Sequence, residues 1–189
     1  MTGQIASILI RPMAQGDLDG IGEIELEAFG ESAWAPRTFH EELRSNRISR
    51  YYVIDLTGDG PLVGYVGCWA LPDAVHLVTI GVRPKYQRQG FGEILVLRAL
   101  DLAYELGTPE VTLECRESNT RAHALYEKYS FVQNGRRPRY YQDTREAAII
   151  MTATNVCSNR FRQALENRRS KLQERYQIQI TTNINPEGS

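Results

Sequence analysis

The sequence contains little cysteine, no long apolar run and almost no net charge. Its three cysteines, Cys68, Cys115 and Cys157, lie far apart, so they predict neither a disulfide framework nor a zinc site with finger spacing. We expect reduced thiols in a cytoplasmic protein that holds no metal. No apolar run is long enough to cross a bilayer, and the first residues lack the pattern of a secretory signal. The formal net charge of −1 gives no global attraction to nucleic acid or to a membrane surface, so neither is expected as a direct partner.

The 189 residues are enough for one domain with its own hydrophobic core. Hydrophobic residues make up 42% and charged residues 24% of the chain, which is the mixture of an ordinary soluble globular protein. Near Thr154 the chain becomes highly charged. Residues 159–177 predict an amphipathic helix, and the final stretch, QIQITTNINPEGS, predicts a loose tail. We therefore predict one domain over residues 1–153 and a helical extension with a loose tail over residues 154–189.

Apolar periodicity and turn residues predict the order of the elements. Strands are expected at residues 7–11, 50–56, 62–70, 74–82, 111–115, 131–134 and 147–151. One helix is expected to begin at Asp17, and three more are expected to cover residues 36–43, 90–106 and 119–129. The cluster TGDGP between the second and third strands predicts an antiparallel hairpin. Several strands come first and helices then alternate with strands, so a mixed sheet is favoured over a doubly wound parallel one.

A glycine-rich loop lies between the strand that ends at Val82 and the longest of these helices. Its residues 87–92 are Gln-Arg-Gln-Gly-Phe-Gly. Free N–H groups and the helix dipole make a helix start a site for anions, and Gly90 and Gly92 would let the backbone close around a pyrophosphate. No Gly-Lys-Ser/Thr follows, which excludes a Walker A loop, and a Rossmann G-x-G-x-x-G is absent. Taken alone, the loop fits a structural turn as well as a phosphate site.

Three motifs in order resemble one protein family. The Q-R-Q-G-F-G loop is similar to the Q/R-x-x-G-x-G/A loop of the GNAT acetyltransferase superfamily. Residues 113–132, LECRESNTRAHALYEKYSFV, resemble the L-E-V-R-x-S-N-x-x-A-x-x-L-Y-x-x-x-G-F stretch of its RimI branch, the ribosomal-protein-alanine N-acetyltransferases. The segments RRPRYY at 136–141 and REAAIIM at 145–151 resemble the closing motifs of that branch. The resemblance covers about residues 7–153 and departs from the pattern at Ser130, where glycine is usual.

The resemblance implies a fold, a co-substrate and a binding site for it. The fold is α/β (α+β), with a central mixed, mostly antiparallel sheet of roughly seven strands and about four flanking helices, followed here by the C-terminal helical extension. The co-substrate is acetyl-CoA, and no metal is implied. In the family, the strand before the loop bonds the pantetheine arm through its main chain, and the loop holds the pyrophosphate. Carried over to this sequence, the acetyl-CoA contacts are Ile80, Gly81, Val82, Arg88, Gln89, Gly90, Phe91, Gly92, Glu93 and Asn119.

The resemblance also implies which residues move protons. Aminolysis of a thioester needs a neutral amine and a proton for the departing thiolate. Glu114 falls at the position of the family's general base and Tyr126 at that of its general acid, while His76 heads a strand where related N-terminal acetyltransferases place a base or a water holder. The residues leave open whether Glu114 or His76 is the principal base. Cys115 could suggest an acyl-cysteine intermediate, but strand alternation would point it away from Glu114, so direct transfer in a ternary complex is expected.

The expected acceptor is the N-terminal amine of a protein. A free α-amine has a pKa of about 7.7–8.0 and lysine one near 10.4, so a site with a modest base favours α-amines. Phe29 and Trp34, in the segment FGESAW, and the pair Tyr140 and Tyr141 resemble the two walls of the family's peptide entrance. The resemblance implies the N-terminal alanine of a small-subunit ribosomal protein as the substrate.

Two other functions stay open. A small-molecule amine such as a polyamine is a second class of acceptor, although its enzymes seldom need a peptide clamp like the Tyr140 and Tyr141 pair. A non-catalytic acetyl-CoA-binding module would need only the phosphate loop and its strand, and not both Glu114 and Tyr126. The basic C-terminal helix fits either a solvated helix docked on the body or a contact with the ribosome or a partner chain. A monomer or weak dimer is expected.

Overall fold

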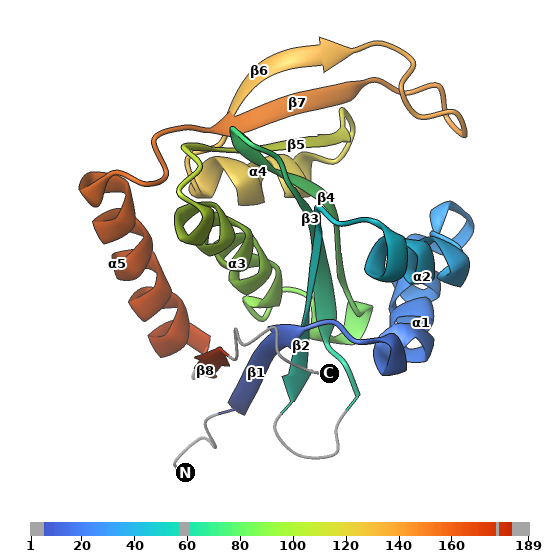
Figure 1. The fold of residues 1–189 in the computed structure, drawn as a ribbon, viewed down its shortest axis with the longest axis horizontal. Coiled ribbons are helices and arrows are strands. Elements are labelled where there is room, and N and C mark those ends of the chain that lie inside the picture. The colour runs from blue at the N-terminus through green and yellow to red at the C-terminus, as the bar shows by residue number, and fades with distance from the viewer. Residues whose placement is uncertain (1–5, 57–60, 177, 183–189) are drawn as a thin grey trace.

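A computed structural model describes residues 6–56, 61–176 and 178–182. Within these residues, eight strands form one sheet in the order β6-β7-β5-β4-β3-β2-β1-β8 (Figure 1). The strands are β1 (Ala6–Pro12), β2 (Ser49–Leu56), β3 (Gly64–Ala70), β4 (Ala74–Val82), β5 (Glu110–Arg116), β6 (Val132–Arg137), β7 (Ala148–Ala153) and β8 (Ile178–Thr182). The helices are α1 (Leu18–Phe29), α2 (Pro36–Ser45), α3 (Phe91–Leu106), α4 (Thr120–Lys128) and α5 (Asn159–Tyr176).

The predicted mixed and mostly antiparallel sheet is confirmed. Neighbouring strands run antiparallel, except that β4 is parallel to β5 and β1 is parallel to β8. The predicted hairpin is present as the antiparallel pair of β2 and β3. Most of its TGDGP turn, residues 57–60, lies outside the described residues.

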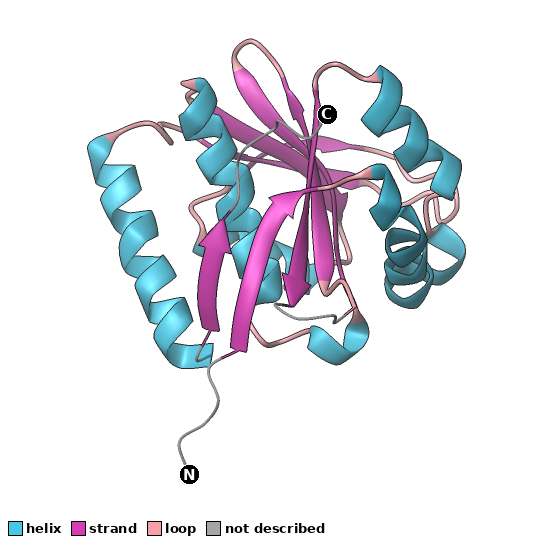
Figure 2. Ribbon diagram, turned by 60° about the horizontal axis from the view of Figure 1, so that its bottom comes forward, coloured by secondary structure: helices cyan, strands magenta, loops and turns pink. Residues whose placement is uncertain are grey.

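Helices cover both faces of the sheet (Figure 2). Helix α3 packs on β3, β4 and β5, and α4 and α5 lie against α3. Helices α1 and α2 pack on the opposite face, against β2, β3 and β4. Each face has its own apolar core, with Leu95 and Leu97 of α3 in one and Phe39 and Tyr65 in the other. Since β4 has helices on both faces, alternate residues of β4 face opposite helix layers.

Helix α3 begins directly after Gly90, in the loop that the sequence predicts to bind phosphate. Gly90 has a φ of +86°, a left-handed conformation that is costly for any residue with a side chain. The helix ends at Gly107, whose φ of +71° confirms the predicted left-handed terminator. The loop is therefore fixed at the N-terminus of a deeply buried helix.

Strands β4 and β5 pair only over their first halves. Their parallel pairing stops after Leu77 and Leu113. At the same point a β-bulge shifts the register between β4 and β3, so that Val78 has no register partner on β3. The second half of β4 thus diverges from β5 and opens the sheet.

The predicted loose tail is wrong for residues 178–182. They form β8, an edge strand that runs parallel to β1 (Figure 1). A short alternating stretch becomes a strand only where a sheet edge is available, and the free edge of β1 supplies one. Helix α5 leads the chain to that edge alongside α3, where Arg162 and Arg169 bind Asp101 at 2.9 and 2.7 Å. The division of the chain at residue 153 stays a prediction.

Candidate active site

The divergence of β4 and β5 opens two hollows that share a wall. We call them the outer cleft, of ≈ 360 Å³, and the inner pocket, of ≈ 390 Å³. Ile80, Asn119, Ala122 and Tyr126 line both, so one ligand could extend from the first into the second. The outer cleft is lined by Ile80, Val82, Gln87, Arg88, Gly90, Gly92, Glu93, Asn119, Arg121, Ala122, Leu125, Tyr126 and Tyr176. The inner pocket is lined by Ala28, Phe29, Ser32, Leu77, Val78, Thr79, Ile80, Glu114, Cys115, Arg116, Asn119, Ala122, Tyr126 and Tyr141.

Most of the residues predicted to contact acetyl-CoA line the outer cleft. They are Ile80, Val82, Arg88, Gly90, Gly92, Glu93 and Asn119. Gly81, Gln89 and Phe91 do not line it. Gly81 faces the other side of β4, where a Cβ atom would lie 2.6 Å from the Tyr65 ring. Phe91 is buried in the core, and the Gln89 side chain donates a hydrogen bond to the Lys85 carbonyl at 2.9 Å.

The glycine-rich loop has a backbone conformation typical of an anion cradle. Arg88 and Gly90 have φ angles of +58° and +86°, and left-handed residues beside a helix start make successive N–H groups converge on an anion. A Cβ atom on Gly90 would lie 2.7 Å from the Tyr176 ring, so only glycine fits there without displacement. Arg88 and Arg121 bring positive charge to the cleft. The cradle therefore fits the pyrophosphate of acetyl-CoA.

Five other residues that line the outer cleft were not predicted from the sequence as site residues. Ala122 and Leu125 share a face of α4 with Asn119 and Tyr126, so helical spacing could have found them. The Asn119 side chain accepts a hydrogen bond from the Ala122 N–H at 3.1 Å, which confirms the predicted helix cap. Tyr176 comes from α5, and no signal in its own neighbourhood connects it with the loop. The missed residues are Gln87, Arg121, Ala122, Leu125 and Tyr176.

Glu114 lies in the inner pocket between two basic side chains. Its carboxylate oxygens lie 2.9 Å from His76 Nε2 and 3.3 Å from an Arg137 nitrogen. The hydrogen bond from His76 lowers the pKa of Glu114 below its ordinary value; partial burial opposes this, and the charges of His76 and Arg137 add to it. Glu114 is therefore an ionised proton acceptor at neutral pH.

His76 contacts Glu114 but does not line the inner pocket. An ionised carboxylate only accepts hydrogen bonds, so Nε2 of His76 donates to Glu114. Nδ1 lies 2.7 Å from the Thr112 hydroxyl, and both ring nitrogens are thus engaged by residues of β5. The two candidate bases form one unit, in which Glu114 is the member that faces the pocket.

Tyr126 lies where the outer cleft and the inner pocket meet. Its side chain is 4% exposed. Burial raises the pKa of Tyr126 above its ordinary value, and Cys115 and Tyr141 act in the same direction. Its hydroxyl therefore keeps its proton at neutral pH and can donate a hydrogen bond.

Cys115 lines the inner pocket beside Glu114, contrary to the expectation from strand alternation. The two strands have already diverged at this point, so neighbouring residues of β5 border the same hollow. Burial raises the pKa of the Cys115 thiol to about 11. The thiolate, which is the nucleophilic form, is therefore scarce at neutral pH.

Two loops that are distant in the sequence close the inner pocket. Phe29 at the end of α1 and Tyr141 between β6 and β7 line it. Asp143 joins the two loops, because it accepts a hydrogen bond from Ser32 at 2.9 Å and pairs with Arg116 at 2.7 Å. The hydrogen bonds from Arg116 and then Ser32 lower the pKa of Asp143 to about 2.

The other two predicted wall residues lie outside the inner pocket. The Trp34 N–H donates to the Glu25 carboxylate at 2.5 Å, and the Trp34 ring lies 5.5 Å from that of Phe39. Tyr140 is 43% exposed, and its ring makes an edge contact with Tyr141 at 5.2 Å. Trp34 thus anchors one loop, and Tyr140 supports the residue that lines the pocket.

Comparison with known families decides the class of protein. The family model described as Acetyltransferase (GNAT) family matches residues 18–131. The chain belongs to the GNAT acetyltransferase family. It is an acetyltransferase of the type that uses acetyl-CoA as co-substrate.

Relatives of this acetyltransferase confirm the resemblance to the RimI branch. The chain is 36% identical over 156 residues to N-alpha-acetyltransferase RimI of Mycobacterium tuberculosis, covering 80% of this chain and 95% of that protein. It is 38% identical over 120 residues to the ribosomal protein bS18-alanine N-acetyltransferase of Escherichia coli K12, covering 62% of this chain and 78% of that protein. The crystal structure of the ribosomal-protein-S18-alanine N-acetyltransferase from Escherichia coli superimposes with a TM-score of 0.70 at 31% identity, over 78% of this chain and 94% of that one.

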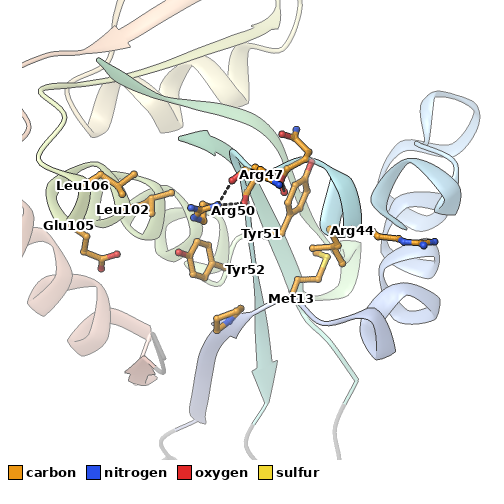
Figure 3. Close-up of a pocket in the computed structure, with 13 residues that line it drawn as sticks. Met13, Arg44, Arg47, Arg50, Tyr51, Tyr52, Leu102, Glu105 and Leu106 are labelled. Carbon is orange, nitrogen blue, oxygen red and sulfur yellow. Dashed lines mark hydrogen bonds between the residues drawn. The ribbon is translucent and has the colours of Figure 1, made fainter. Parts of the chain in front are cut away.

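A third hollow of this GNAT protein shares no lining residue with the outer cleft or the inner pocket; Figure 3 shows the side chains that line it. This arginine cavity, of ≈ 500 Å³, contains none of the residues predicted for acetyl-CoA, acceptor or catalysis. Arg50 donates hydrogen bonds to the carbonyl oxygens of Arg47 and Ser49 at 3.0 and 2.7 Å. The cavity is lined by Pro12, Met13, Leu43, Arg44, Asn46, Arg47, Ser49, Arg50, Tyr51, Tyr52, Leu102, Glu105 and Leu106.

The described part of this acetyltransferase holds neither a cluster of metal ligands nor a membrane-spanning helix. Among residues 6–56, 61–176 and 178–182, no three His, Cys, Asp or Glu side chains gather closely enough to hold a metal ion. Over the same residues, no helix combines the length and the apolar composition that crossing a bilayer requires. Cys68, Cys115 and Cys157 are free cysteines.

Proposed function

We propose that this acetyltransferase modifies the N-terminal α-amine of a protein, with the N-terminal alanine of a small-subunit ribosomal protein as its acceptor. The name of the relative from Mycobacterium tuberculosis supports an α-amine, and the name of the relative from Escherichia coli supports an alanine of a ribosomal protein. The observation that carries the proposal is the inner pocket, where Glu114 and Tyr126 border one hollow between two loops. Such a pocket suits the end of a chain, because the amine can enter while the following residues stay between the loops.

Acetyl-CoA would occupy the outer cleft, where it supplies the acetyl group and a thiolate leaving group. Arg88 and the amides at the start of α3 would hold the pyrophosphate. Ile80 and Val82 would line the pantetheine arm on β4, and Asn119 would border it from α4. Gly81, Gln89 and Phe91 would act on this site only through the structure of the strand and the loop.

Glu114 is the proposed general base. An α-amine is already partly neutral near its pKa of about 8, so the base must accept a proton only while the nitrogen bonds to carbon and becomes strongly acidic. The lowered pKa of Glu114 keeps it ionised and ready to accept that proton, directly or through a water molecule. His76 is proposed to position the carboxylate, since both its ring nitrogens are engaged.

Tyr126 is the proposed general acid. The raised pKa of its hydroxyl keeps the proton in place at neutral pH. From the junction of the two hollows, that hydroxyl would donate a hydrogen bond and then its proton to the departing sulfur. Phe29 and Tyr141 would contact the acceptor, with Trp34 and Tyr140 supporting the two loops. In this proposal residues 1–153 are the catalytic domain and residues 154–189 are its extension.

The acceptor is tested by acetyl-CoA turnover, measured as release of free thiol. Peptides that begin with Ala, Ser or Met-Leu would be compared with spermidine, and fragmentation mass spectrometry would locate the acetyl group. We expect the Ala peptide to be the best acceptor, with the acetyl group on its α-amine. Turnover of spermidine without turnover of peptides would move the protein to the small-molecule enzymes. Tight acetyl-CoA binding with no turnover on any acceptor would instead indicate a binding module.

A further inference from the structure

Helix α5 carries two basic stripes with different partners. Arg162 and Arg169 face α3, where both bind Asp101. Arg168, Lys171 and Arg175 follow one another at i, i+3 and i+7, so they share another side of the helix. Within the described part of the chain, none of these three forms a salt bridge with an acidic side chain.

This second stripe, in which Arg168 lies over the Tyr129 ring and Arg175 over the Tyr176 ring, lines a fourth hollow, which we call the basic rim. It has a volume of ≈ 290 Å³ and is lined by Glu93, Lys128, Arg168, Lys171, Leu172, Arg175 and Tyr176. Its one acidic residue is already engaged, because Glu93 pairs with Lys128 at 2.5 Å and accepts a hydrogen bond from Tyr129 at 2.7 Å. The basic rim therefore has an excess of positive charge and suits an anion.

The basic rim adjoins the proposed acetyl-CoA site. Glu93 and Tyr176 line both the rim and the outer cleft. The position of a Cβ atom on Gly90 lies 2.7 Å from Tyr176 and 3.2 Å from Leu172, and Leu172 is itself buried. The last turns of α5 thus pack directly on the loop proposed to hold the pyrophosphate.

We infer that Lys171 and Arg175, with Arg168 beside them, bind the 3′-phosphate of acetyl-CoA, so that the C-terminal extension is part of the co-substrate site. The inference rests on the proposed binding of acetyl-CoA in the outer cleft. Coenzyme A carries this phosphate on the ribose next to its pyrophosphate, and it is a second compact anion. Lysine and arginine side chains form charge-assisted hydrogen bonds with phosphate oxygens. The family model ends at residue 131, so these three residues lie outside the region that the model matches.

The test compares two ligands that differ only in that phosphate, coenzyme A and 3′-dephospho-coenzyme A. Their dissociation constants would be measured by titration calorimetry with the full chain, with no acceptor present. We expect the wild type to bind coenzyme A about tenfold or more tightly than the dephospho form, as one or two charge-assisted hydrogen bonds would give. The double variant Lys171→Ala/Arg175→Ala should bind both ligands with dissociation constants within about twofold of each other, while its affinity for the dephospho form stays that of the wild type.

Two matched variants complete the experiment. Arg160→Ala removes an exposed arginine of α5 that does not line the rim, and it should keep the full discrimination between the ligands. Lys171→Arg with Arg175→Lys keeps the charges and should restore most of the discrimination. Equal weakening of both ligands in the double variant would overturn the inference, because it would indicate damage to the loop. Equal dissociation constants of the wild type for coenzyme A and its dephospho form would overturn the inference as well.

The outcome is separable from that of the proposed function. Peptide acetylation that uses acetyl-CoA and its dephospho form equally well would contradict binding of the 3′-phosphate by the basic rim and would still support the proposed function. Full discrimination between coenzyme A and its dephospho form, without acetylation of any peptide, would support the role of the basic rim and contradict the proposed function.

Discussion

The two hollows of the candidate active site and the arginine cavity are similar in size but differ in how their charged groups are held. In the inner pocket, Glu114 is fixed by His76 and Arg137, and Tyr126 is buried with its proton in place. In the arginine cavity, Arg50 donates hydrogen bonds to the backbone carbonyls of Arg47 and Ser49, close to it in the sequence (Figure 3), and Glu105 is already paired with Arg98 at 2.5 Å. Catalysis needs titratable groups that are held in place and still face the hollow. The volume of a hollow therefore does not by itself identify a catalytic site.

The difference originates in the sheet. The inner pocket lies where a strand pair opens, so side chains of β4 and β5 stay fixed by their strands while they face a shared space. The arginine cavity lies between the end of α2, the start of β2 and the end of α3, and its arginines come from the last turn of α2 (Arg44), the connecting segment (Arg47) and the start of β2 (Arg50). Side chains on strands are held more precisely than side chains on loops, and Arg47 is the arginine of this cavity that lies on a loop.

The largest expected effect is from Glu114→Gln. The amide keeps the size of the side chain but cannot accept a proton, so kcat on an Ala peptide should fall by a factor of about 10² to 10⁴. Steady-state thiol release would measure it, with the acetyl-CoA KM expected to change little. A variant that keeps more than about a third of wild-type kcat would show that Glu114 is not the general base.

Gly90→Ala should have the next largest effect. The left-handed φ of +86° costs a non-glycine residue about 1–2 kcal/mol, and the added methyl group meets Tyr176. The acetyl-CoA dissociation constant should rise about tenfold, with a nearly unchanged kcat at saturation. Gly107→Ala is the matched control, since it places a methyl group at a similar left-handed φ of +71° at the other end of α3, where the methyl meets no atom within 4 Å. Equal losses in both variants would contradict the explanation by strain at Gly90.

His76→Phe tests the positioning role through pH, because phenylalanine keeps a ring at this position but donates no hydrogen bond to Glu114. The hydrogen bond from His76 is the main cause of the lowered pKa of Glu114, so without it that pKa rises. Glu114 would then become protonated at a higher pH, and the acid limb of kcat/KM should shift upward while kcat near pH 8 falls about tenfold or less. An unchanged acid limb would show that His76 does not act through Glu114.

Asp143→Ala should affect the acceptor and not acetyl-CoA. Without Asp143 the two loops lose the contacts with Ser32 and Arg116 that hold them together. Because exposed pairs of this kind contribute little free energy, the peptide KM should rise by up to about fivefold. Since the pKa of Asp143 is lowered to about 2, these contacts weaken only as the pH falls toward that value, and assays near neutrality would not disturb them in the wild type. A larger change in the acetyl-CoA KM than in the peptide KM would contradict this role.

Arg47→Ala should have the smallest effect. It removes a side chain from the arginine cavity, away from both active-site hollows, so kcat and both KM values should stay within about twofold of wild type. A tenfold loss of peptide acetylation would show that the arginine cavity takes part in acceptor binding. The comparison of the two regions would then fail.

Local chemistry made much of the fold predictable. Gly90 and Gly107 limit α3, and Asn119 caps α4, because each uses a conformation or a hydrogen bond that few other residues supply. The family motifs extended this to the sheet and to most residues of the outer cleft. Such signals depend on neighbours in the sequence or on spacing along one helix, so the order of the amino acids is enough to find them.

Contacts between distant segments could not be predicted in the same way. The pairing of His76 with Glu114 depends on the register of β4 and β5. The position of Cys115 beside Glu114 in the inner pocket depends on the divergence of these strands after a bulge. Tyr140 and Tyr141 are alike in the sequence, and only the loop conformation decides which one lines the pocket. The position of Tyr176 against Gly90 required the packing of α5 and the pairing of β8 with β1.

The central claim is that the cleft between β4 and β5 acetylates a protein N-terminus. Its most direct measurement is the acetylated fraction of small-subunit ribosomal protein N-termini, by mass spectrometry, in cells that carry this gene, in cells without it, and in cells complemented with wild type or Glu114→Gln. The account predicts that the acetyl group on one alanine N-terminus disappears on deletion and returns with the wild type but not with the variant. An acetylated N-terminus that persists on deletion, or full restoration by Glu114→Gln, would contradict it.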